Sequence, residues 1–208
     1  MKAREEILRR VQAAHVTAGD QGIRRDYAHT VECSDPVGMF VERVEDYKAT
    51  VIRTDPGGVA VAVAESLVGA RRVVVPAGFN RSWLPDGIDI VHDEPVLSAD
   101  DLDGVDAVLT SAVVGIAVTG TIVLDHTEGQ GRRALTLVPD LHVCVVTADQ
   151  IVGDVPEAVA RLSASVSAGR PLTWVSGPSA TVDIELIRVH GVHGPRTLRV
   201  VLVESATP

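Results

Sequence analysis

Short apolar runs alternate with polar breaks along the chain, and their spacing predicts the elements of its first half. Helices are predicted over 1–15, from Asp35-Pro36 onward, over 59–67 and over 98–102, and strands over 50–54, 71–76, 88–92 and 106–110. Asp35 suits the N-cap position, and the proline that follows suits a first helical turn. Because the strand runs are apolar enough to be buried on both faces, the pattern favours a mostly parallel sheet flanked by helices.

The second half of the chain predicts more strands than helices. Residues 115–124 consist of two apolar runs around Thr119-Gly120-Thr121, which is typical of two strands joined by a turn or a bulge. Further strands are predicted over 141–146, 172–175 and 198–203, a helix over 155–162, and a short helix over 183–191 that Thr181 caps and Gly191 closes. We expect an N-terminal helix and surface arm over 1–32, followed by one α/β domain over 33–208.

Composition and charge narrow the class of protein. The 208 residues are 46% hydrophobic but only 3% aromatic, so a sizeable core must be largely aliphatic. The formal net charge is −9 and the basic residues are scattered, which argues against binding to nucleic acid. No apolar run approaches the roughly 20 residues of a membrane span, and the charged N-terminus does not resemble a signal peptide, so we expect a cytoplasmic protein.

The chain has two cysteines, Cys33 and Cys144, which are far apart in sequence, and this number limits the redox centres that it can hold. An iron–sulfur cluster takes about four thiolates, so this chain cannot hold a Cys-ligated cluster alone. Cys144 lies in an apolar run and is expected to be buried. His190 and His193 have His-x-x-His spacing, but we interpret them as polar turn residues and predict no metal site.

The stretch 176–181 is the first candidate site. It places Ser176, Gly177, Ser179 and Thr181 between a predicted strand and a predicted helix, where backbone N–H groups and a helix dipole favour an anion. The alternative is a well-capped connection that binds nothing. Beyond it, Asp183 and Glu185 fall on different sides of a helix, so they form a poor acid–base pair, although each could orient a hydroxyl group or pair with an arginine.

Two further candidates lie outside that stretch. Gly120, between Thr119 and Thr121, would let a ligand approach the backbone closely, but the sequence alone favours the alternative, a β-bulge. Arg133 follows a glycine-containing loop, from which its guanidinium could bind a carboxylate or phosphate as a two-pronged fork; the alternative is a surface charge. No Gly-x-Ser-x-Gly nucleophile motif is present.

Long collinear motifs resemble the LUD-domain family. They are TGTIVLD (119–125), GRRALTLVPDLHVCVV (131–146), SGPSATVDIEL (176–186) and GVHGPRTLRVVLV (191–203), and the resemblance extends to RRDY (24–27), FVERVEDYKATV (40–51) and RRVVVPAG (71–78). It implies a Rossmann-like sheet of the NagB, RpiA and CoA-transferase group. It further implies a place in the oxidation of L-lactate to pyruvate, beside iron–sulfur partner proteins, for an accessory or regulatory subunit without its own cluster.

The resemblance also indicates which residues matter. The family's typical residues correspond to Thr119, Gly120, Thr121, Arg133, Pro139, His142, Ser176, Gly177, Ser179, Asp183, Glu185, Gly191 and Gly194. Val118 departs from the acid that many members carry before Thr-Gly-Thr, and valine cannot move a proton or form an acyl link.

Two alternatives to the accessory subunit stay open. One is a small-molecule enzyme or binder of the isomerase or CoA-transferase type, which would hold an anionic metabolite among Thr119–Thr121, Arg133, His142 and residues 176–181. The other, a nucleotide-dependent ligase, has no recognisable phosphate loop in its favour.

Overall fold

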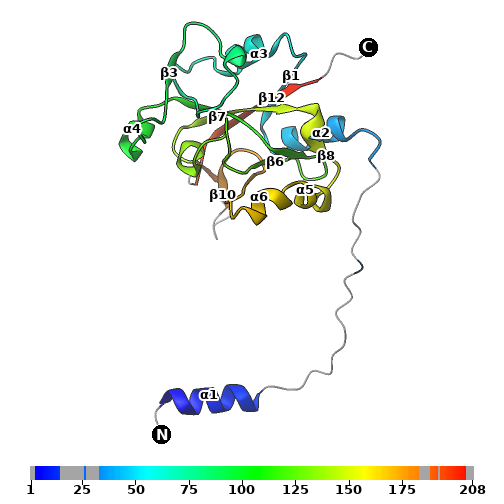
Figure 1. The fold of residues 1–208 in the computed structure, drawn as a ribbon, viewed down its shortest axis with the longest axis vertical. Coiled ribbons are helices and arrows are strands. Elements are labelled where there is room, and N and C mark those ends of the chain that lie inside the picture. Colours follow the sequence, from blue (N-terminus) through cyan, green and yellow to red (C-terminus); the bar gives the residue numbers. More distant parts are fainter. Residues whose placement is uncertain (1–2, 15–25, 27–32, 183–187, 192, 205–208) are drawn as a thin grey trace.

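A computed structural model describes residues 3–14, 26, 33–182, 188–191 and 193–204, and of 181–182 and 188–190 it describes only the backbone. Two sheets organise the body of the molecule (Figure 1). The larger has six strands in the order β1-β12-β7-β4-β2-β3, and each of its pairings is parallel. The smaller has four strands in the order β8-β5-β6-β9. The predicted α/β class, with a mostly parallel sheet flanked by helices, is confirmed.

The element bounds follow the apolar periodicity closely. The helices are α1 (Ala3–Ala13), α2 (Pro36–Asp46), α3 (Val59–Ser66), α4 (Ala99–Asp103), α5 (Val155–Arg161) and α6 (Ser163–Ser167), with short 3₁₀ turns η1 (Arg81–Trp83), η2 (Arg133–Thr136) and η3 (Ala148–Gln150). The strands of the larger sheet are β1 (Thr50–Thr54), β2 (Arg72–Val74), β3 (Asp89–Val91), β4 (Ala107–Ser111), β7 (Leu141–Thr147) and β12 (Thr197–Val203). Those of the smaller sheet are β5 (Val114–Ile116), β6 (Thr121–Leu124), β8 (Ile151–Val152) and β9 (Thr173–Val175).

Local capping explains where two of the helices begin. The Asp35 side chain accepts a hydrogen bond from the Gly38 N–H, so it caps α2 as predicted. Ser98 caps α4 and forms a reciprocal capping box with Asp101. Each cap satisfies N–H groups that the first helical turn would otherwise leave unpaired.

The predicted helix over 183–191 is wrong at its described residues, 188–190. Ala180–Val182 (β10) and Arg188–His190 (β11) are strands that pair antiparallel, and residues 183–187 lie outside the described part. The run contains several β-branched residues, which favour strands, and a short apolar run does not by itself separate helix from strand. The described residues on either side of 183–187 are strands, so they do not supply the helix dipole expected there.

Both faces of the six-stranded sheet are covered. α3 packs on one face through Val59, Ala62 and Val63. α2 and the four-stranded sheet pack on the other face, where Phe40 belongs to one buried cluster with Ile122, Leu124, Cys144, Val200 and Leu202. α5 covers the outer face of the four-stranded sheet. The core is accordingly aliphatic, as the composition predicts.

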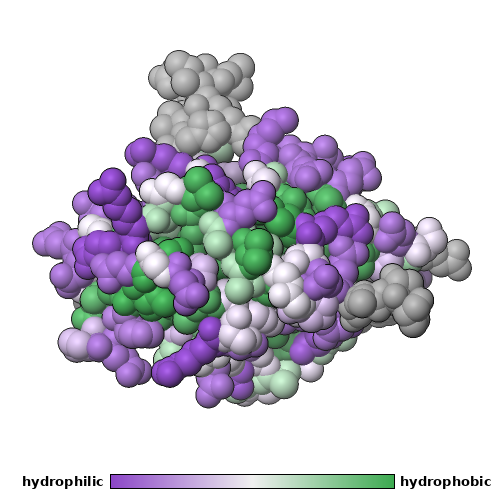
Figure 2. Space-filling view, turned by 90° about the horizontal axis from the view of Figure 1, so that it is seen from above, coloured by the Kyte–Doolittle hydropathy of each residue, from purple (hydrophilic) through white to green (hydrophobic). Residues whose placement is uncertain are grey.

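α1 contributes no described residue to this core, whereas Leu102, Val105 and Leu135 form a further buried cluster with Val74 and Val108. α1 has no buried residue, and its ion pairs from Arg9 and Arg10 to Glu6 lie within the helix. The division at residue 32 stays a prediction, because 15–25 and 27–32 lie outside the described part. No helix in the described ranges has the length and apolarity to span a bilayer. On the face seen in Figure 2, apolar surface lies in separate patches among hydrophilic side chains.

Gly120 is where the four-stranded sheet approaches α2 most closely. Its φ of +57° suits glycine, and a Cβ there would lie 2.6 Å from the Arg43 backbone carbon. Gly120 is buried, so its partner is the helix and not a ligand.

We therefore expect Gly120→Ala to destabilise the protein by about 2–4 kcal/mol, because it adds a backbone clash to an unfavourable φ. Gly69→Ala is the control, since Gly69 has a φ of +94° with nothing within 4 Å of the added Cβ. It should lose only about 1 kcal/mol. Urea unfolding measures both, and equal losses would contradict the close packing.

Candidate functional site

Five of the predicted site residues line one cleft, which we call the small cleft. It has a volume of about 210 Å³ and lies between β9, the hairpin β10–β11 and the first residues of β7 and β12. The predicted residues in its wall are Arg133, His142, Ser176, Gly177 and Ser179. Three segments distant in sequence therefore meet at one place.

The small cleft lies at a different edge of the sheet from the one expected. His142 and Leu198 line it, and each is the second residue of its strand, so the cleft opens near the amino ends of β7 and β12. The stretch from Ser176 does follow the carboxyl end of a strand, but that strand is β9 of the smaller sheet. The usual rule for ligands at the carboxyl edge of an open parallel sheet therefore does not explain this cleft.

Backbone hydrogen bonds join Ser179 to Gly191 and Pro195 within the stretch 176–195. The Ser179 N–H donates to the Pro195 carbonyl at 2.8 Å, and the Gly191 N–H donates to the Ser179 carbonyl at 3.0 Å. The Ser179 hydroxyl also accepts from the His193 N–H at 3.2 Å. Together these bonds hold the wall of the small cleft in shape.

A chain of hydroxyl groups leads away from the small cleft. The Thr119 hydroxyl donates to Thr121 Oγ1 at 2.8 Å, and Thr121 Oγ1 lies 2.7 Å from Ser176 Oγ. Thr119 itself borders a different hollow, together with Val118, Arg43 and Tyr47. The predicted Thr-Gly-Thr thus supports the cleft through Ser176 without lining it.

Three predicted residues cannot be placed in the site. Thr181 lies in β10, but its side chain is outside the described part. Asp183 and Glu185 also fall outside the described residues. Their assignment to the site stays a prediction.

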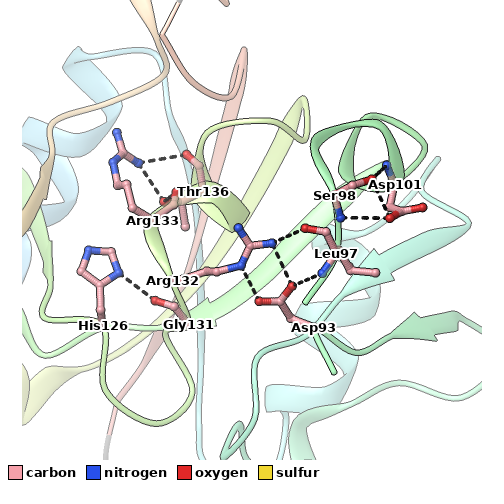
Figure 3. Close-up of polar contacts among 9 residues, drawn as sticks. All are labelled: Asp93, Leu97, Ser98, Asp101, His126, Gly131, Arg132, Arg133 and Thr136. Atoms are coloured by element: carbon pink, nitrogen blue, oxygen red, sulfur yellow. Dashed lines mark hydrogen bonds and ion pairs between the residues drawn. The ribbon is translucent and has the colours of Figure 1, made fainter. Parts of the chain in front are cut away.

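Arg133 is the cation of the small cleft. Its guanidinium donates to the Thr136 carbonyl at 3.2 Å and to Thr136 Oγ1 at 2.8 Å, as Figure 3 shows. No carboxylate among the described residues pairs with it. Partial burial lowers the pKa of Arg133, although the side chain stays exposed and charged. Its remaining N–H groups are therefore available to an anion.

Neighbouring contacts fix the loop that carries Arg133. The Asp125 carboxylate accepts from Ser165 and from Thr127, each at 2.6 Å, and from Arg170 at 3.2 Å. Burial alone would raise the pKa of Asp125, but the hydrogen bonds and the arginine hold it below its usual value. This buried carboxylate ties the beginning of the loop to α6.

Arg132 ties the end of the same loop to the β3–α4 connection. Its guanidinium donates to both oxygens of Asp93, at 2.7 and 3.0 Å, and to the Leu97 carbonyl at 2.6 Å (Figure 3). Of these two neighbouring arginines, only Arg133 is left for a ligand, because Arg132 is already neutralised.

His142 lies beneath the small cleft and is almost fully buried. Its Nε2 is 2.8 Å from the Thr110 hydroxyl. Burial, with the nearby positive charge of Arg133, lowers the pKa of His142 to about 4. The imidazole is therefore neutral at neutral pH, so the charge of the cleft comes from Arg133.

Cys144 follows on the same strand and is fully buried. The Thr110 hydroxyl donates to its sulfur at 3.6 Å, and burial raises the pKa of the thiol to about 12. Cys144 is therefore an inert thiol of the core, as the sequence predicts.

A second cavity, which the sequence analysis missed, borders Arg133 from the other side. It has a volume of about 810 Å³ and is lined mainly by residues 75–79, 92–94 and 126–133. We call it the large cavity. Its signals in the sequence were Gly78, Gly129 and Gly131, whose positive φ values mark two tight loops.

Comparison with known proteins places these features in context. The model of the LUD domain matches residues 37–203. Lactate utilization protein C of Deinococcus radiodurans is 55% identical over 165 residues, which cover 79% of this chain and 78% of that protein. An uncharacterized protein of Neisseria meningitidis is 27% identical over 98% of this chain and 94% of its own length. The crystal structure of a DUF162 family protein from Deinococcus radiodurans superposes with a TM-score of 0.74 at 47% identity, covering 83% of this chain and 99% of that one.

The low pKa of His142 generates a pH prediction. In the unfolded chain a histidine has a pKa near 6.5, above the folded value of about 4. The unfolded state therefore takes up the proton first, and stability is full above the unfolded pKa and falls as the pH drops from there toward the folded pKa. Between about pH 7.5 and about pH 5, His142 should account for roughly 2 kcal/mol of lost stability.

His142→Gln, which keeps a polar group near Thr110, should reduce that loss when urea unfolding is measured at both pH values. His193→Gln is the control, because His193 is exposed. An unchanged pH dependence in His142→Gln would contradict the burial of a neutral imidazole.

Proposed function

The chain belongs to the LUD-domain family, and from that premise we propose that it acts in L-lactate utilization as a cytoplasmic accessory or regulatory subunit, beside iron–sulfur partner proteins. The match to lactate utilization protein C of Deinococcus radiodurans carries this proposal. The chain has only two cysteines, and Cys144 is an inert core thiol, so the electrons of lactate oxidation would pass through clusters held elsewhere.

The small cleft supports a contribution to ligand binding within that system. Arg133 provides a guanidinium that no carboxylate of the described residues pairs with, and a planar guanidinium matches the two oxygens of a carboxylate. The volume of about 210 Å³ suits a small acid, and Ser176 adds a hydroxyl group beside it. We infer that the cleft holds a small carboxylate of the size of lactate or pyruvate, with Arg133 as the anchor.

The same observation favours the second candidate function, a binder or enzyme of the isomerase or CoA-transferase type that acts on an anionic metabolite. His142 is neutral at neutral pH and lines the cleft, so it could exchange a hydrogen bond with a bound acid without adding charge. The two functions differ in what they require. The first requires partner proteins, whereas the second requires only that the chain alone binds the ligand.

Deletion of the gene from its host tests the first function. The strain should fail to grow on L-lactate as sole carbon source but grow normally on pyruvate, because only the oxidation step is lost. A tagged full-length chain should restore growth and co-purify proteins that contain iron and acid-labile sulfide. Normal growth of the deletion strain on L-lactate would contradict the proposal.

Thermal unfolding of the purified chain with L-lactate, pyruvate and acetate tests the small cleft. A ligand at about 100 times its dissociation constant stabilises a protein by about 2.7 kcal/mol, so a rise in Tm is readily measured. Arg133→Ala should abolish the rise, because it removes the anchor. Arg71→Ala is the matched control, since Arg71 is exposed and lines neither cavity. A ligand-induced shift that survives in Arg133→Ala would exclude this site.

A further inference from the structure

The topology of the six-stranded sheet marks a ligand position that the small cleft does not use. β2 and β4 are parallel neighbours. From β2 the chain continues outward to β3 at the edge, whereas from β4 it turns the opposite way toward β7. Adjacent strands whose connections leave in opposite directions open a crevice at their carboxyl ends, and ligands of open α/β sheets bind in such a crevice.

The large cavity lies at this crevice. Residues 75–79 follow β2, residues 92–94 follow β3, and residues 126–133 belong to the connection between β4 and β7. All three segments line the cavity, so topology and cavity agree on one place. Its volume of about 810 Å³ falls within the range of pockets that hold cofactor-sized ligands.

The loops around the large cavity are fixed to one another. The Gly129 N–H donates to the Ala77 carbonyl at 2.8 Å, and the Gly129 carbonyl accepts from the Ser111 N–H at 2.8 Å. Gly78 has a φ of +78°, and a Cβ there would lie 2.6 Å from the Cβ of Glu128. The cavity therefore has its shape before any ligand binds, which keeps the entropic cost of binding low.

The charges in its wall are divided between paired and unpaired groups. Arg132 and Asp93 neutralise each other through two hydrogen bonds. Arg81 and Arg133 have no carboxylate partner among the described residues, so both can bind an anion. The carboxylates of Glu94 and Glu128 are exposed and lie on the same wall. An ionised carboxylate accepts hydrogen bonds but does not donate them, so these two side chains suit donors such as sugar hydroxyls.

The rest of the wall is apolar. Phe79, Leu84 and Leu135 line the large cavity beside Pro76 and Pro171. An apolar wall favours a flat, poorly hydrated group. One class of ligand matches all three kinds of side chain in this wall. Its base would lie against the apolar side chains, its hydroxylated sugar near the glutamates, and its phosphate near the arginines.

We propose that the large cavity is a binding site for a nucleoside phosphate. The phosphate lies near Arg81 and Arg133, the base lies against Phe79 and Leu84, and the sugar hydroxyls face Glu94 and Glu128. Arg133 also lines the small cleft, so occupation of one cavity changes the affinity of the other. The site does not depend on the lactate proposal.

Isothermal titration of the full chain with AMP, adenosine and ribose 5-phosphate tests the site, because adenosine and ribose 5-phosphate each lack one part of AMP. AMP should bind with one-to-one stoichiometry. Adenosine should bind at least about tenfold more weakly, because it lacks the charge that the arginines recognise. Ribose 5-phosphate should also bind more weakly, because it lacks the base.

Two variants place the binding in the large cavity. Ala77→Trp fills the cavity from an exposed position in its wall, and it should weaken AMP binding by about tenfold or more. Arg81→Ala removes one exposed cation and should weaken AMP but not adenosine. Val68→Trp is the control, since Val68 is 70% exposed and lines neither cavity.

Three results would overturn the proposal. Absence of saturable AMP binding, or AMP binding that Ala77→Trp and Arg81→Ala leave unchanged, overturns the proposal. Equal affinity for AMP and ribose 5-phosphate also overturns it, because the base then contributes nothing and the ligand is a sugar phosphate. Failure of the lactate experiments leaves these results unaffected, since they measure a different ligand in a different cavity.

Discussion

The anion binding that we propose depends on the loop that carries Arg133, because hydrogen bonds and ion pairs fix this loop at both of its ends. Asp125 anchors the beginning of that loop through Ser165 and Arg170, and Arg132 anchors its end through Asp93. These buried or partly buried charges satisfy one another, and no carboxylate in the described part of the chain pairs with Arg133. A guanidinium in such a position, in the wall shared by two cavities, is the main source of attraction for anions on this side of the protein.

Much of the architecture could be predicted from periodicity and capping. Asp35 and Ser98 begin helices as expected, because a side-chain cap is a local signal. The hairpin after Ala180 could not be separated from a helix, since only its pairing partner decides the conformation. The smaller sheet was equally hidden: β8 has two residues, and no local pattern indicates that β9 joins β6 instead of the larger sheet.

The sequence indicated which residues line the candidate site better than it indicated where in the fold that site lies. Arg133, His142 and the Ser176 stretch were each selected, and they line one cleft. Its position near the amino ends of β7 and β12 depends on tertiary packing that spacing alone does not contain. Gly120 shows the opposite case: a glycine that suggested contact with a ligand instead accommodates the backbone of Arg43. The large cavity was missed because three separate loops form it, and none of them contains a recognised motif.

The order of strands has a consequence for how the protein is made. β12 lies between β1 and β7, and its pairing joins Thr50 to Arg199. On the ribosome, β1 emerges long before this neighbour has been translated, so its pairing edge stays without a partner for most of elongation. A premature stop before residue 197 would remove the strand that joins β1 to β7, so β1 would have no partner in the sheet.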